Sequence, residues 1–124
     1  MATSQPLIEQ LFTASRTSGG RVVSYPELLP EMRVYRITIP FGAKIPLHIH
    51  PSPVVVVVVE KGRLSNVLII DGVEVSETLE SGEGFLEGHP AEPNYVINRG
   101  IRPVASLVTF ASVEGMPNQI QLRP

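Results

Sequence analysis

The sequence contains no cysteine, and its 124 residues include only two lysines, Lys44 and Lys61. The absence of cysteine excludes disulfides, thiolate zinc sites and cysteine nucleophiles, so any metal must be held by His, Asp, Glu or Asn side chains. The formal net charge is -2, and no basic stripe is present that could hold a phosphate backbone. We therefore expect no nucleic-acid partner.

Long apolar segments are also missing. The run Val54–Val59 holds six valines, far fewer than the roughly 20 apolar residues that span a membrane as a helix. Residues 1–18 lack the basic start and long apolar stretch of a signal peptide. We expect neither membrane insertion nor secretion from these residues, and a cytoplasmic location; a signal peptide removed ahead of this sequence is left open.

What the chain does have is enough apolar material for one packed core. Hydrophobic residues make up 43% of the sequence, while twelve prolines and ten glycines predict many turns. We predict a helical segment over residues 1–20 and a single domain over residues 21–124. The helix itself is expected at residues 6–15, where Pro6 stands at the start. Four apolar side chains fall on one face of this helix: Leu7, Ile8, Leu11 and Phe12.

After residue 20 almost every apolar run is short, rich in Val, Ile or Tyr, and bracketed by Pro, Gly or Asn. This pattern predicts an antiparallel all-β domain of about nine strands. The expected strands are Met32–Ile39, Pro46–His50, Val54–Val59, Leu64–Ile70, Val73–Thr78, Gly82–Glu87, Asn94–Asn98 and Val104–Ala111, with an extended tail over Pro117–Pro124.

Two local patterns sharpen this prediction. Asp71-Gly72 suits the positive φ angles of a two-residue hairpin turn between its flanking strands. Val54–Val59 is apolar on both faces, so a strand there must be covered on both sides, by a second sheet or by a second subunit. Barrel closure would protect it from open-edge aggregation. We also expect a homodimer that forms across this strand.

His48 and His50, here called the histidine pair, lie two residues apart. On a strand both side chains point to the same face, and Pro51 favours an extended backbone at His50. Two imidazoles side by side are suited to binding a metal. The alternative is two solvent-facing histidines in a proline-rich loop.

The residues around the histidine pair resemble the first sequence motif of the cupin family. Gly42 is followed after five residues by His48-Ile49-His50, then by an apolar strand and by Glu-Lys-Gly at residues 60–62. The second cupin motif is similar to residues 81–100, which combine a glycine-rich strand at 81–87, a proline-containing turn at 90–93 and Asn98-Arg99-Gly100. The Asp71-Gly72 hairpin lies between the two motifs, where cupins place their intermotif strands.

The resemblance spans roughly residues 22–124, and the last part is similar to the tails of small bacterial cupins. It implies an all-β fold of the cupin type, a double-stranded β-helix or jelly-roll barrel, with the short helix ahead of it. It also implies a divalent transition metal, Fe, Mn, Ni or Zn, at the mouth of the barrel, and a small-molecule ligand there.

Two positions depart from the ligand set of three histidines and one glutamate that the family uses. Val54 and Val55 stand where the glutamate is expected, and Asn94 stands where the third histidine is expected. The resemblance therefore implies the histidine pair as ligands, with Glu87 or Asn94 completing the set. An inward-pointing Glu87 would give two histidines and one carboxylate, which suits non-haem iron.

Other side chains have two interpretations each. Phe41, Phe85 and Tyr95 are candidates to line a ligand pocket, with core filling as the alternative. His89 and Glu92 lie near the second motif, where they are either additional ligands or ordinary turn and surface residues.

Three functions follow from these observations. The first is a metal-dependent enzyme, an oxygenase or an isomerase-like cupin, that acts on a small molecule. The second is a small-ligand binding or sensing protein with a degenerate metal site. The third is a structural subunit that dimerises through the valine-rich sheet. The fold alone does not choose between them, because one scaffold hosts many functions.

Overall fold

The computed structural model describes residues 5–122. Within that range all nine elements of regular secondary structure are β-strands. The prediction of an all-β chain is confirmed. The strands are β1 (Pro30–Ile39), β2 (Lys44–Ile49), β3 (Val54–Val58), β4 (Arg63–Ile70), β5 (Val73–Glu80), β6 (Gly84–Glu87), β7 (Asn94–Ile97), β8 (Val104–Val113) and β9 (Ile120–Gln121).

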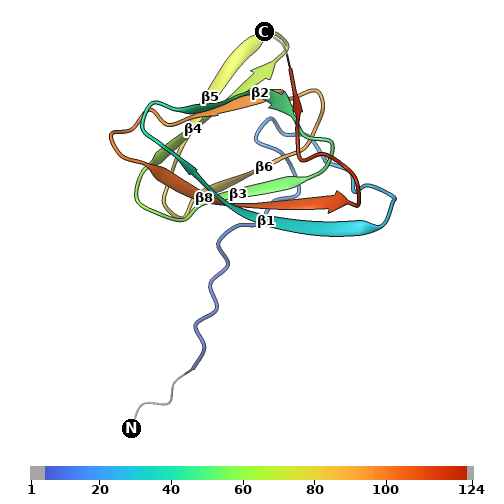
Figure 1. The fold of residues 1–124 in the computed structure, drawn as a ribbon, viewed down its shortest axis with the longest axis horizontal. Helices are drawn as coiled ribbons and strands as arrows, with labels where there is room; N and C mark the ends of the chain where they lie inside the picture. The colour runs from blue at the N-terminus through green and yellow to red at the C-terminus, as the bar shows by residue number, and fades with distance from the viewer. Residues whose placement is uncertain (1–4, 123–124) are drawn as a thin grey trace.

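The strands form two antiparallel sheets that are stacked as layers (Figure 1). One sheet has the order β1-β8-β3-β6, and the other has the order β5-β4-β7-β2-β9. Over residues 5–122 no strand pair joins the two sheets, so the predicted closed barrel is corrected to an open two-sheet sandwich. The prolines between β2 and β3 give one reason: Pro51 and Pro53 have no N–H, so the chain changes sheets there without continuing a ladder.

The core lies between the two layers. Val54, Val56 and Val58 point inward from β3, and all three are buried. The valine run is not at an edge, because β3 lies between β8 and β6. The other buried members of the core come from both sheets: Ile39, Leu64, Leu79, Phe85, Val96, Val104, Val108 and Phe110.

The hairpin predicted at Asp71-Gly72 is confirmed. Ile70 lies opposite Val73 in the β4–β5 ladder, so the loop has two residues. Both loop residues have positive φ angles, 51° at Asp71 and 78° at Gly72, as a type I′ turn requires.

The predicted helix at residues 6–15 is wrong, because the chain has no helical structure there. Leu7 and Ile8 are 82% and 91% exposed, and of the four side chains on the predicted apolar face only Phe12 is partly buried, next to Gly84. A helix of about ten residues is marginal in water unless one face packs against the protein.

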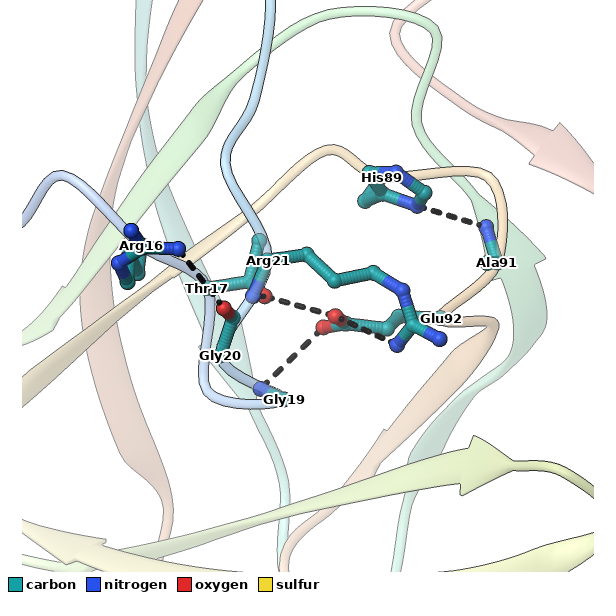
Figure 2. A network of polar contacts seen from close by, with 8 residues as sticks. All are labelled: Arg16, Thr17, Gly19, Gly20, Arg21, His89, Ala91 and Glu92. Carbon is teal, nitrogen blue, oxygen red and sulfur yellow. Dashed lines mark hydrogen bonds and ion pairs between the residues drawn. The ribbon is translucent and has the colours of Figure 1, made fainter.

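Residues 16–22 are instead attached to the β6–β7 loop by the buried carboxylate of Glu92 (Figure 2). The Thr17 hydroxyl donates a hydrogen bond to Glu92 at 2.8 Å, and the Gly19 N–H donates a second at 3.3 Å. Arg21 pairs with the same carboxylate at 3.2 Å. A Cβ on Gly19 would lie 2.5 Å from the carboxylate, so a larger residue at this position would have to displace the Glu92 carboxylate. Glu92 is therefore an anchor for the N-terminal segment.

Replacing Glu92 by alanine is expected to lower the free energy of unfolding by about 1–3 kcal/mol, because the Thr17 hydroxyl and the Gly19 N–H lose their acceptor in a buried place. Trypsin should also cleave faster after Arg21. Denaturant unfolding and timed proteolysis measure the two effects. Glu114→Ala, at an exposed glutamate, is the control. Equal stability and equal cleavage for both variants would contradict the anchoring role.

Candidate metal centre

The histidine pair lies at one end of the core, with His48 in β2 and His50 just after it. Both side chains are buried, at 2% and 5% exposure. The two-residue period of the strand turns them to the same side, and their Nε2 atoms are 3.0 Å apart. The alternative of two solvent-facing histidines does not hold.

The hydrogen bonds of the two rings decide which nitrogen is available. The Nδ1 atom of His48 is 2.7 Å from the Pro46 carbonyl oxygen, and the Nδ1 atom of His50 is 2.7 Å from the Asn118 carbonyl oxygen. A carbonyl only accepts, so each Nδ1 carries a proton. In a neutral imidazole the Nε2 atom is then the acceptor. Both Nε2 lone pairs therefore face the same point.

Glu87, the last residue of β6, brings a carboxylate to this point from the opposite sheet. Its Oε1 atom lies 3.0 Å from the Nε2 atom of His50, and Glu87 is only 9% exposed. One ligand atom from each of the three residues lies within 4.8 Å of the other two. Among residues 5–122 this is the one such group of His, Asp or Glu side chains.

Asn94 contacts this group through its amide nitrogen. It lies opposite His48 in the β2–β7 ladder, and its Nδ2 atom donates to Glu87 Oε2 at 2.7 Å and to Asn66 Oδ1 at 2.7 Å. An amide nitrogen that donates two hydrogen bonds has no lone pair for a metal. In this arrangement Asn94 orients the carboxylate of Glu87.

The pKa values of the two histidines are shifted in opposite directions. Burial lowers the pKa of His48, and the neighbouring His50 lowers it further, while the Pro46 carbonyl and Glu87 oppose them without reversing the shift. Burial also acts to lower the pKa of His50, but the charge and hydrogen bond of Glu87, with the Asn118 carbonyl, outweigh it, so the pKa of His50 is raised. Without metal, His50 is therefore the more readily protonated of the two rings.

Two of the three separations between donor atoms fit an octahedral metal ion. Adjacent ligands of an octahedral ion with bonds of about 2.1 Å are about 3.0 Å apart. The Nε2–Nε2 and Nε2–Oε1 separations are both 3.0 Å. Two imidazoles and one carboxylate are the donor set of non-haem iron sites with open positions.

A small cavity of about 40 Å³ adjoins the three side chains. Phe85, one of the predicted pocket residues, forms part of its wall together with Ile45, Val56 and Phe110. Phe41 is 66% exposed and Tyr95 lies outside the wall, beneath the Lys44 ammonium. Tyr95 points outward because its neighbours in β7, Asn94 and Val96, are buried and point inward.

His89 and Glu92 do not join the cluster. The Nδ1 atom of His89 accepts a hydrogen bond from the Ala91 N–H at 3.0 Å, as a turn residue does (Figure 2). Glu92 holds the N-terminal segment, as described above, and is not a surface residue.

Sequence reasoning missed the contribution of residues 116–121. The Asn118 carbonyl orients His50, Gln119 lines the cavity, and β9 pairs with β2. Arg33 ties this segment to the four-stranded sheet by donating to the carbonyls of Val113 and Met116 and to the Asn118 side chain. No sequence signal identifies such contacts, because every residue offers a carbonyl and the partners are far apart in the chain.

We expect the metal-free protein to titrate His50 above pH 6.5 and His48 below it. The protonated His50 stabilises the folded state below pH 6.5, and that contribution is lost as the pH rises through the raised pKa. Glu87→Gln removes the charge that holds the proton, so the pKa of His50 should fall. NMR titration of the ring protons measures both values. An unchanged His50 pKa in Glu87→Gln would contradict the pairing.

Comparisons with known proteins support the fold. No family model matches the sequence, and none of the curated proteins matches it. Among solved structures, oxalate oxidase in complex with the substrate analogue glycolate is 22% identical with a TM-score of 0.62, over 73% of this chain and 46% of that one. Oxalate decarboxylase of Bacillus subtilis, described with Mn(II) centres, is 22% identical with a TM-score of 0.63, over 73% and 24%.

Vicilin from hazelnut (Corylus avellana) is 18% identical with a TM-score of 0.60, over 72% of this chain and 24% of that one. The matches therefore span less than half of the oxalate oxidase and about a quarter of the other two proteins. Oxalate oxidase and oxalate decarboxylase are cupins. The two-sheet arrangement that this chain shares with them identifies its fold as the cupin fold.

Proposed function

We propose that this protein binds one divalent transition metal through His48, His50 and Glu87, and acts there on a small molecule. The observation that carries the proposal is the convergence of two Nε2 lone pairs and one carboxylate oxygen in a buried place. Burying a carboxylate and two imidazoles costs free energy unless they are paired or bind a metal. The Mn(II) centres named for the solved oxalate decarboxylase are consistent with the metal.

A bound metal would supply Lewis-acid or oxygen-activating chemistry. The chain's own residues perform the positioning. The carbonyls of Pro46 and Asn118 hold the imidazoles in one tautomer, and Asn94 holds the carboxylate of Glu87. A mainly apolar cavity wall borders the group on its open side.

The size and charge of the cavity limit the ligand. A volume of about 40 Å³ admits no more than a few non-hydrogen atoms unless the wall opens. The residues that line it include no lysine or arginine. With one carboxylate and a dication the site would carry a single positive charge, which favours a small neutral molecule or a small monoanion.

The second candidate, a small-ligand binding protein without catalysis, is favoured by one observation. Apart from His48, His50 and Glu87, the cavity wall carries no titratable side chain. An enzyme that moves protons would need one of these three, or a metal-bound water, to do so. Turnover of small carboxylic acids by the metal-loaded protein distinguishes the two candidates: metal bound at full occupancy with no turnover favours the binding protein.

Protein purified without a His tag should contain close to one equivalent of Fe, Mn, Ni or Zn, or should take it up on reconstitution. His48→Ala and His50→Ala should lose this metal, because two donors are too few for a buried site. Elemental analysis by mass spectrometry gives the stoichiometry. His89→Ala is the matched control and should keep the metal. A parent protein that binds no metal after reconstitution would refute the proposal.

Asn94→Ala tests how Glu87 is held. Removing the amide frees the carboxylate to turn, and the loss of such a bond behind a ligand weakens metal binding by about 10–100-fold. Competition with a chelator of known affinity measures this change. An affinity equal to that of the parent would show that Asn94 does not orient the carboxylate.

A further inference from the structure

Residues 5–11, here called the arm, form an extended apolar segment without a partner in the chain. Leu7, Ile8 and Leu11 are 82%, 91% and 51% exposed. The arm leaves the sandwich on the side of the four-stranded sheet and points away from it (Figure 1). Its side chains therefore add nothing to the core of their own molecule.

The outer face of the same sheet carries an apolar groove of about 490 Å³. Its walls come from the strands and from the segment that follows the arm, and no charged residue is among them. Side chains that line it include Val22, Tyr25, Met32, Val55 and Leu86. Met32 is 64% exposed and Tyr25 is 79% exposed, so the groove is open to a ligand from outside.

The groove is next to an unpaired strand edge. β1 pairs with β8 on one side, and within residues 5–122 no strand pairs with its other side. Val34, which follows Met32 on the outer face of β1, is 60% exposed. A ten-residue edge strand with exposed apolar side chains invites pairing with another chain.

The total exposed surface also favours a contact with a second molecule. The chain exposes 7931 Å². A compact monomer of 13.5 kDa is expected to expose about 6,500 Å². The excess is larger than the roughly 800 Å² that each partner buries in a standard interface. The excess of the whole chain, to which the exposed arm contributes, is thus of the size that a contact between two molecules buries.

We infer that a second copy of this chain covers this face, with the arm of each protomer lying in the groove of its partner. Each chain supplies both an unpartnered apolar arm and an uncharged apolar groove. One two-fold contact therefore buries two arms and two grooves. The groove offers no charged residue to meet the Glu9 carboxylate of the arm, so the proposed contact leaves Glu9 at the open rim of the groove, in water. The contact lies outside the metal centre and does not depend on it.

The absence of cysteine allows a direct test by disulfide trapping. Ile8→Cys protein is mixed with Met32→Cys protein and oxidised, and the products are identified by mass spectrometry. The arm-in-groove contact predicts a mixed disulfide between the two variants, which only two different chains can form. Val73→Cys replaces Met32→Cys in the control, because Val73 is 61% exposed but lies on the other sheet.

Sedimentation of the full chain gives the oligomeric state. The parent should be a dimer, and the triple variant Leu7→Ser, Ile8→Ser, Leu11→Ser should dissociate with a Kd raised at least about a hundredfold. The variant should unfold like the dissociated parent protomer, because the arm contributes nothing to the core. Val73→Ser should leave the dimer intact. A monomeric parent at 100 μM, a dimer unaffected by the triple change, or mixed disulfides as frequent with Val73→Cys would each overturn the inference.

Discussion

The buried polar cluster at one end of the apolar core requires hydrogen-bond partners from the segments around it. Two imidazoles and a carboxylate cannot remain in such a place unless each polar atom has a partner. Four segments supply those partners: the Pro46 carbonyl from β2, the Asn94 amide from β7, Glu87 from β6 and the Asn118 carbonyl just before β9. The candidate centre thus connects the two sheets, which share no ladder of hydrogen bonds within residues 5–122.

The parts of this structure that depend on short spacings could be predicted from the sequence. His48 and His50 share a face because a strand has a period of two, and Asp71-Gly72 forms a hairpin because the turn needs positive φ angles that these residues tolerate. The strand positions follow from the same kind of local pattern. Their bounds differ from the prediction by only a few residues at each end.

What could not be predicted depends on contacts between distant segments. The arm has the pattern of a helix, yet it has no surface to pack on within its own molecule, and pattern alone does not reveal that. Glu87 and Glu92 are both buried glutamates five residues apart. Glu87 points into the candidate metal centre and Glu92 holds the N-terminal segment. Only the register of β6 and the course of the loop after it decide between these two roles.

The carbonyl that orients His50 has a consequence for the order of events during synthesis. Asn118 follows His50 by 68 residues in the chain. At a translation rate of about 5–20 residues per second, those 68 residues take about 3–14 seconds to synthesise. During that interval the ring of His50 lacks the bond that fixes its tautomer, and from residue 87 onward the Glu87 carboxylate is present as well. A nascent chain therefore exposes the histidine pair before the bond that orients His50 can form.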